Sequence, residues 1–244
     1  MKRLPAIVLT VAALALPASV SGGTPITVFA AASLTEVLPR IDKAPRYSFA
    51  GSDQLAIQIQ QGAPADVFAA ASPKQPELLF RNGLVRRPAV FATNKLIVLV
   101  PRSNPAHIQS AYDLRREGVK IVIGALTVPI GAYTRQILDA LGITAEVTKN
   151  VVSEETDVKG IVTKVALGEA DAGFVYSTDA KTVSTRVKTI KVPAWAQPKV
   201  QYGICVVTAS AHKADAQAFV KRVLSKSGQA KLLAAGFLPR IKKR

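Results

Sequence analysis

Short apolar runs alternate with segments of helical spacing along the first third of the chain. β-branched and apolar runs at residues 24–31, 46–50 and 65–70 predict buried strands. The segments that follow them, at residues 34–41, 53–61 and 77–81, have the spacing of short helices. Ser33 and Glu36 match the S-x-x-E pattern of a capping box, so we expect Ser33 to cap the first helix. The order predicts a parallel sheet with helices on both faces.

The middle of the chain repeats this alternation, which predicts a second small α/β lobe. Its expected strands lie at residues 95–100, 120–124, 146–151, 172–176 and 187–192. Its expected helices lie at residues 111–117, 131–141 and 157–167. The last part differs, with a strand at 200–207, helices at 214–225 and 228–235, and a basic tail. Since no low-complexity linker separates the two lobes, we expect strands that cross between them.

The N-terminus has the pattern of a secretory signal peptide. Met1-Lys2-Arg3 is basic, residues 6–17 are uncharged and nearly all apolar, and small residues follow. The apolar run is shorter than the roughly 20 residues that a membrane-spanning helix needs, so an uncleaved anchor is the weaker interpretation. We expect residues 1–21 to be removed, with cleavage after Ser21, leaving an exported, soluble protein.

Composition narrows the classes of partner without choosing one. The chain has 244 residues, 49% of them apolar, which permits one large domain or two small ones. Its single cysteine excludes an intramolecular disulfide and an all-cysteine metal site. The formal net charge of +16 suggests an anionic partner, which could be nucleic acid, a membrane or a small anion. The basic residues are dispersed and have no aromatic-rich stripe, which argues against specific nucleic-acid recognition.

Residues that could support catalysis are sparse. The chain has no G-x-S-x-G, P-loop or G-x-G-x-x-G motif. His107 and His212 lie far apart and are expected at the surface. Cys205 lies within an apolar strand, where an inert core thiol is the expected role. An enzyme is therefore the weaker hypothesis.

Strand-to-helix junctions are better candidates for a binding site. Ser33, Ser52 and the Pro129-Ile130-Gly131 turn each place backbone N–H groups at the start of a helix. Such groups, with the positive end of the helix dipole, bind anions without a formal charge. A serine at a helix start is more often only a cap, so the junctions favour anion capture without proving it.

Five motifs in order show a resemblance to a known family. The chain resembles the molybdate-binding proteins of ABC transporters, the periplasmic component known as the ModA family. The resemblance covers residues 24–237 and is carried by VFAAASLTEVL at 28–38, FAGSDQLAIQIQQGAPADVFAAAS at 49–72, VPIGAYTRQILDALG at 128–142, DVKG at 157–160 and GEADAGFVYSTDA at 168–180.

The resemblance implies a type II periplasmic binding protein fold, α/β and two-lobed, that closes on molybdate or tungstate. By motif position, the implied ligand contacts are Ser33, Ser52, Ile130, Val158 and Tyr176. Serine hydroxyls, the backbone N–H groups and the phenol O–H are all donors, as an oxyanion without a proton requires. Molybdenum is held only as its oxyanion, with no direct metal coordination. No cofactor is implied, because the oxyanion is cargo.

Two positions depart from the family pattern, and one has an alternative role. Ile130 stands where alanine is common, so its side chain has to point away from the oxyanion. Asp53 follows Ser52, where a neutral residue is expected. Pointing inward, Asp53 would suit a protonated anion such as hydrogen phosphate; we expect it to face solvent in the first helical turn instead. Tyr176 could alternatively be a core residue, and Tyr133, equally ambiguous, is left out of the ligand set.

We therefore expect a periplasmic solute-binding protein, a monomer and not an enzyme, that delivers molybdate or tungstate to a membrane permease. The first lobe is expected to comprise residues 22–96 and 203–244, and the second residues 97–202, with crossing segments near 92–98 and 201–207. Hinge closure would bring donors from both lobes onto the ligand. The alternatives are the same fold with sulfate, phosphate or another anion, and a basic exported protein that binds polyanions.

Overall fold

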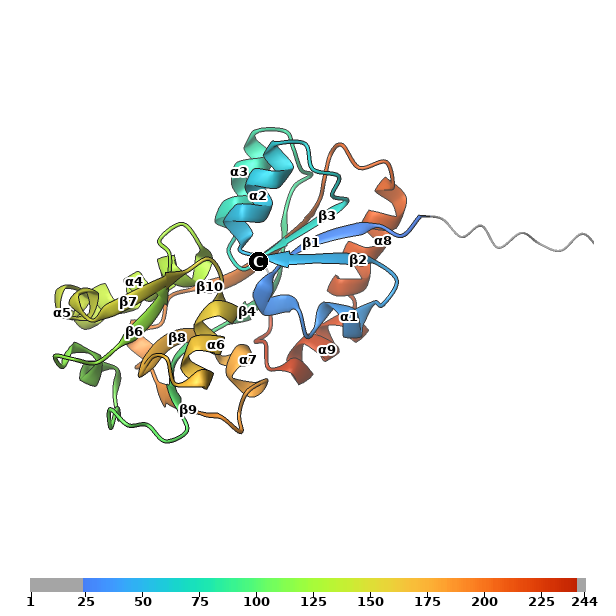
Figure 1. Ribbon diagram of the computed structural model, residues 1–244. Helices are drawn as coiled ribbons and strands as arrows, with labels where there is room; N and C mark the ends of the chain where they lie inside the picture. Colours follow the sequence, from blue (N-terminus) through green and yellow to red (C-terminus); the bar gives the residue numbers. More distant parts are fainter. Residues whose placement is uncertain (1–23, 241–244) are drawn as a thin grey trace, which may run out of the picture.

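Two five-stranded sheets, each covered by helices, form two lobes that lie side by side (Figure 1). The computed structural model describes residues 24–240, so the predicted signal peptide at residues 1–21 lies outside the described residues. Within that range, no helix is both long enough and apolar enough to span a membrane. The predicted α/β fold, with a mostly parallel sheet in each lobe, is confirmed.

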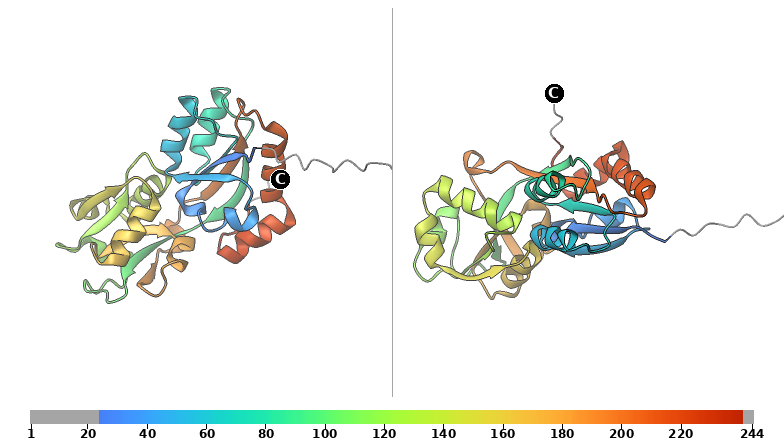
Figure 2. Two further views of the ribbon diagram at one scale, coloured as in Figure 1. Left: turned by 45° about the vertical axis from the view of Figure 1, so that its right-hand side comes forward. Right: turned by 90° about the horizontal axis from the view of Figure 1, so that it is seen from above.

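The first lobe is built on a sheet with strand order β2-β1-β3-β10-β4, in which only β10 runs antiparallel to its neighbours. Its strands are β1 Thr27–Ala31, β2 Arg46–Ala50, β3 Val67–Ala70, β4 Ala89–Asn94 and β10 Val200–Val206. Its helices are the 3-10 helix η1 Ala32–Leu34, α1 Leu38–Ile41, α2 Ser52–Gln60, α3 Lys74–Arg81, α8 Lys213–Leu224 and α9 Lys226–Ala235. In Figure 2, α8 and α9 lie at the far end of this lobe from the second lobe.

The second lobe repeats the arrangement with strand order β7-β6-β8-β5-β9, in which only β5 is antiparallel to its neighbours. Its strands are β5 Leu96–Pro101, β6 Ile121–Gly124, β7 Val151–Glu155, β8 Ala172–Tyr176 and β9 Val187–Lys191. Its helices are η2 Ala111–Arg115, α4 Pro129–Leu141, α5 Thr144–Lys149, α6 Val158–Leu167, α7 Ser177–Lys181 and η3 Ala194–Ala196.

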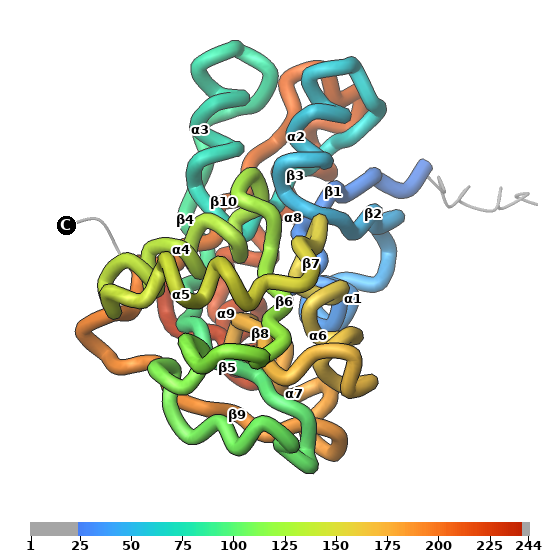
Figure 3. The backbone as a smooth tube through the Cα atoms, turned by 60° about the vertical axis from the view of Figure 1, so that its left-hand side comes forward, coloured from blue at the N-terminus to red at the C-terminus, as the bar shows by residue number. Residues whose placement is uncertain are grey.

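The chain passes between the two sheets twice, and the backbone trace in Figure 3 follows both passages. It leaves the first sheet at the end of β4 and enters the second with β5, one residue later. It returns between η3 and β10, which pairs with β3 and β4 from Val200 onward. The Gln197 side chain joins the two passages, since its amide donates to the Leu96 carbonyl at 2.7 Å and accepts from the Leu96 N–H at 3.0 Å.

Local sequence signals explain where several helices begin and end. Asp157 precedes α6 and accepts from the N–H groups of Lys159 and Gly160, at 2.7 and 3.2 Å. Gly142 and Gly168 end α4 and α6 in the left-handed region, with φ of 68° and 78°, where glycine has no steric penalty.

Two patterns in the sequence led to wrong or incomplete predictions of local structure. The strand predicted at residues 146–151 is wrong: α5 occupies most of that segment, and β7 begins only at Val151. The β-branched residues of this segment favour a strand, but α5 instead buries Val147 in the core. Strand β4 was not predicted as a strand, although residues 92–94 fall in the expected crossing segment.

The cores agree with the apolar patterns. One cluster of buried residues extends through both lobes, and a smaller one packs α2 and α3 against the first sheet. Cys205 is 2% exposed in this smaller cluster, where burial raises the pKa of its thiol well above the ordinary value. The expected inert core thiol is therefore confirmed.

Candidate functional site

A small cavity lies between the two lobes, where loops at the strand ends of both sheets meet. Its walls are Ala31, Ala32, Ser33, Ala50, Gly51, Ser52 and Ala71 from the first lobe, and Val128, Pro129, Ile130, Asp157, Val158 and Tyr176 from the second. All five residues predicted for the ligand site line this one cavity. It measures about 20 Å³, against roughly 10–15 Å³ for a site that holds one water. The cavity is therefore small, with little more room than one water needs.

Three α-helices begin at the cavity, and their free N–H groups are the main donors there. Ser52 and Val158 are the first residues of α2 and α6, and Ile130 is the second residue of α4. N–H groups at these positions have no carbonyl partner inside their own helix. Pro129 begins α4 and has no N–H, so Ile130 supplies the first donor of that helix.

The cap of α6 leaves one donor unused. Asp157 Oδ1 accepts from the second and third N–H groups of the helix, those of Lys159 and Gly160. The first N–H, that of Val158, is not bound by this cap. The capping carboxylate thus fixes the start of α6 while leaving the Val158 N–H for a ligand.

Both serine hydroxyls already have a hydrogen-bond partner within the protein. The backbone N–H of Ala71 donates to Ser52 Oγ at 3.1 Å, and because an amide can only donate, the Ser52 hydrogen stays free. Ser33 Oγ lies 3.0 Å from the hydroxyl of Tyr202, and Tyr202 is on β10, the strand that returns from the second lobe. The predicted capping box of Ser33 and Glu36 is wrong: Ser33 lies inside η1, and no side chain caps that turn.

The Tyr176 hydroxyl lies at the cavity with no hydrogen-bond partner in the described part of the chain. The side chain is 1% exposed, and burial raises the pKa of the phenol well above its ordinary value. The phenol therefore keeps its proton and can donate. A buried polar group without a partner is costly, which indicates that a ligand supplies the missing acceptor.

The two departures from the family pattern are now placed. The Ile130 side chain packs over Gly124 at the end of β6, where an added methyl group would lie 2.7 Å from Ile130 Cγ2. Asp53 does not line the cavity. The expectation that it faces solvent is wrong for one oxygen, because Oδ1 is buried beside Gly51 at the start of α2 and has no partner among the described residues.

The two lobes touch at the rim of the cavity. A methyl group built on Gly51 would overlap the backbone carbonyl oxygen of Thr156 and lie 3.4 Å from Val128 Cγ1, both in the second lobe. Gly51 itself has φ of −59° and ψ of 138°, which any residue can adopt. Glycine is needed here because the opposite lobe leaves no room for a side chain.

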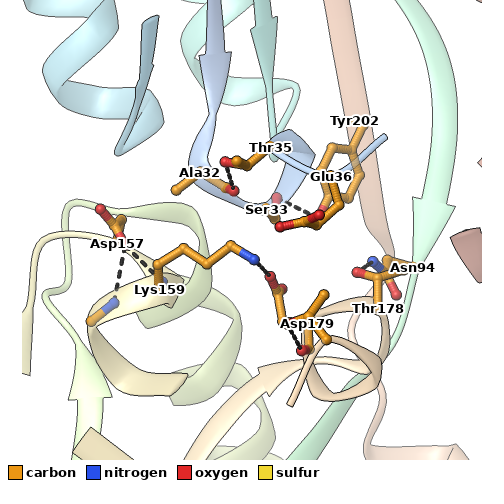
Figure 4. Close-up of polar contacts among 12 residues, drawn as sticks. Ala32, Ser33, Thr35, Glu36, Asn94, Asp157, Lys159, Thr178, Asp179 and Tyr202 are labelled. Carbon is orange, nitrogen blue, oxygen red and sulfur yellow. Dashed lines mark hydrogen bonds and ion pairs between the residues drawn. The ribbon is translucent and has the colours of Figure 1, made fainter. Parts of the chain in front are cut away.

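A charged pair that the sequence did not reveal lies beside the cavity (Figure 4). Lys159 Nζ is 3.2 Å from Asp179 Oδ1, and Asp179 is 1% exposed. Burial raises the pKa of Asp179 to about 6, Lys159 opposes that rise, and the nearby carboxylates of Asp157 and Glu36 add to it. No local pattern could have found this pair, since its members lie on different helices, α6 and α7.

Asp179 should make folding stability depend on pH. Its folded-state pKa is about 6, above the ordinary 3.8, so the folded state binds this proton more tightly than the unfolded chain does. The contribution of this group to stability therefore rises as pH falls from about 7 to about 4.5. Between these pH values, the free energy of unfolding of Asp179→Asn should rise by on the order of 1–2 kcal/mol less than that of wild type. Urea unfolding of both proteins at the two pH values measures it; an equal pH dependence would contradict the expectation.

Comparison with known proteins agrees with this geometry. Residues 26–238 match the family described as bacterial extracellular solute-binding protein. The molybdate-binding protein ModA of Mycobacterium tuberculosis is 38% identical over 226 residues, which cover 88% of this chain and 85% of that relative. The solved periplasmic molybdate-binding protein of Azotobacter vinelandii is 23% identical, with a TM-score of 0.79, and covers 88% of this chain and 100% of its own.

The fold alone does not identify the ligand. The sulfate-binding protein SubI of Mycobacterium tuberculosis also matches, at 18% identity and a TM-score of 0.76, covering 88% of this chain and 87% of its own. The likeness to these structures confirms the predicted periplasmic binding protein fold. The chain belongs to the family of bacterial extracellular solute-binding proteins, and it is a binding protein rather than an enzyme.

Proposed function

We propose that this protein captures molybdate or tungstate in the cavity between its lobes, in the periplasm, and delivers it to the membrane permease of an ABC transporter. It acts as a monomer, and the oxyanion is cargo rather than a cofactor. Ser33, Ser52, Ile130, Val158 and Tyr176 are the proposed contacts. The proposal is supported by relatives that are named as molybdate-binding proteins and that match this chain over most of their length.

The observation that carries the proposal is the buried, unpartnered hydroxyl of Tyr176, a residue that lines the same cavity as the starts of three helices. The ligand must accept from every direction, because the two serines, the two amides and the phenol all have hydrogens to give. A fully ionised tetrahedral oxyanion does so without offering a hydrogen of its own. Charge-assisted bonds of this kind are roughly twice as strong as neutral ones.

The same accounting disfavours a protonated anion. Hydrogen phosphate would need an acceptor at the cavity, and Asp53, the candidate raised by the sequence, does not line it. Asp157 does line the cavity, and since its Oδ1 is bonded to two N–H groups of α6, only its Oδ2 is left as an acceptor for a protonated anion. Sulfate carries no proton but is smaller than molybdate or tungstate, so a ring of fixed donors can discriminate between these anions by their size.

Thermal unfolding with a panel of anions tests the proposal. The protein without residues 1–21 is melted alone and with molybdate, tungstate, sulfate or phosphate at matched ionic strength. A ligand at about 100 times its Kd stabilises by roughly 2.7 kcal/mol, which is a clear rise in Tm. We expect that rise with molybdate or tungstate. Stabilisation by sulfate or phosphate alone, or by none of the four anions, would sink the assignment.

A further inference from the structure

Tyr202 lies behind the cavity and contacts one of its serines. It is fully buried, on β10, next to an irregularity in the pairing of β10 with β4. Its ring packs edge-on against Tyr176, Phe91 and Phe237, with centroids 5.7, 5.9 and 5.3 Å away. Its hydroxyl lies 3.0 Å from Ser33 Oγ (Figure 4). Tyr202 is not among the residues that line the cavity, so its hydroxyl can act on a ligand only through a neighbour, and Ser33 is the neighbour that this hydroxyl contacts.

Asn94 lies near Tyr202 (Figure 4). Asn94 Oδ1 accepts from the Lys95 N–H at 2.9 Å, which sets the orientation of the amide, and the Asn94 NH₂ group donates to Thr178 Oγ1 at 3.0 Å. Between Tyr202 and Ser33 either hydroxyl can be the donor. The direction of that bond decides whether Ser33 keeps its hydrogen for a ligand.

We propose that Tyr202 is a positioning residue for oxyanion binding: its hydroxyl donates to Ser33 Oγ and so turns the Ser33 hydrogen into the cavity. A serine has one hydrogen, and if Ser33 gave it to Tyr202 it could offer the ligand only a lone pair, which repels an anion. Hydrogen bonds are then donated from Tyr202 to Ser33 and from Ser33 to the ligand. This inference rests on the proposed function, in particular on Ser33 as a ligand contact.

Ser33 and Ser52 are held in a similar way, but their hydrogen-bond partners differ. Ser52 Oγ accepts from the backbone N–H of Ala71, within the same lobe. The partner of Ser33 is instead a side chain, that of Tyr202, on strand β10, which follows the return passage between the lobes. A side-chain donor can be removed by substitution, whereas the Ala71 amide cannot, so Ser33 is the serine at which the mechanism can be tested.

A double-mutant cycle on the whole mature protein tests the inference. Molybdate affinity is measured by calorimetric titration for wild type, Tyr202→Phe, Ser33→Ala and the double variant. Phenylalanine keeps the ring in its aromatic cluster but removes a buried hydrogen bond, so the ligand-free Tm of Tyr202→Phe should fall by a few degrees while the protein stays folded. We expect Tyr202→Phe to weaken binding about fivefold in wild type and less than twofold when Ser33 is already alanine.

Tyr47→Phe is the matched control, since the Tyr47 hydroxyl donates to the carbonyls of Asp42 and Leu38, away from the cavity. It should leave molybdate affinity unchanged. Equal weakening by Tyr202→Phe with and without Ser33 would overturn the inference, because a general structural role predicts that result. No weakening by Tyr202→Phe in a wild type that binds would also overturn it. If wild type binds none of the four anions, both the proposed function and this inference fail.

Discussion

Replacing Gly51 by alanine is expected to weaken molybdate binding at least about 100-fold while leaving the ligand-free fold intact. The added methyl group would overlap the Thr156 carbonyl of the opposite lobe, which is backbone and cannot rotate aside. Its other close neighbour is the Asp53 side chain, which can move. The lobes then cannot close fully, and the donors of Ile130, Val158 and Tyr176 are held away from the ligand. A 100-fold loss of affinity corresponds to ~2.8 kcal/mol of binding free energy. Several charge-assisted hydrogen bonds together supply more than this.

Calorimetric titration gives the affinity, and small-angle X-ray scattering reports the closure. In wild type, molybdate should shrink the radius of gyration; in Gly51→Ala it should leave the radius unchanged. The ligand-free Tm serves as the internal control, because the Gly51 backbone angles are open to alanine. Normal affinity in this variant would show that the contact between Gly51 and Thr156 is not part of the ligand-bound state.

Tyr176→Phe should change stability and binding in opposite directions. The phenol oxygen is buried without a partner in the ligand-free protein, so its removal should leave the Tm unchanged or raise it. The same change removes a donor to a charged ligand, which is worth about 1.5–3 kcal/mol, so affinity should fall roughly tenfold to 100-fold. A lowered Tm together with weaker binding would instead identify Tyr176 as a core residue, the alternative that its place at the end of an apolar strand left open.

Melting curves and titrations on the same samples separate these outcomes. Tyr47→Phe again provides the reference, because its hydroxyl has two carbonyl acceptors in the protein and none at the cavity. That variant should lose stability and keep its affinity. Tyr176→Phe should thus lose affinity without losing stability, and Tyr47→Phe should lose stability without losing affinity. A general folding defect would not produce this pair of results.

The alternation of apolar runs and helical spacing was enough to predict two mostly parallel sheets, because the inner strands of each sheet are short apolar runs buried on both faces. Residues 67–70, for example, are all buried in β3. The same reasoning failed at α5, where threonine and valine favour a strand but the local turn and the burial of Val147 favour a helix. Intrinsic preference is weak in so short a segment, and packing overrides it.

Ser33, Ser52 and the turn at Ile130 could be found from the sequence because they lie at junctions between strands and helices. Val158 and Tyr176 were implied only by the family resemblance. The hydrogen-bond partners of the cavity residues could not be predicted. Ser33 and Tyr202 lie 169 residues apart, and Lys159 and Asp179 meet only because α6 and α7 pack together. The S-x-x-E pattern at Ser33 even suggested the wrong partner, since a local motif carries no information about a strand that arrives from the other lobe.

Among the described residues no positive side chain lines the cavity, and this divides the kinetics of binding into two parts. Its walls carry no lysine or arginine, and the one carboxylate there, that of Asp157, caps a helix. The large positive net charge of the chain therefore acts on an anion only while it approaches, when dissolved salt can screen the attraction. Once the lobes have closed, no ion pair has to break before the anion leaves. Ionic strength should govern how often an anion arrives, whereas its residence time depends on how often the lobes part.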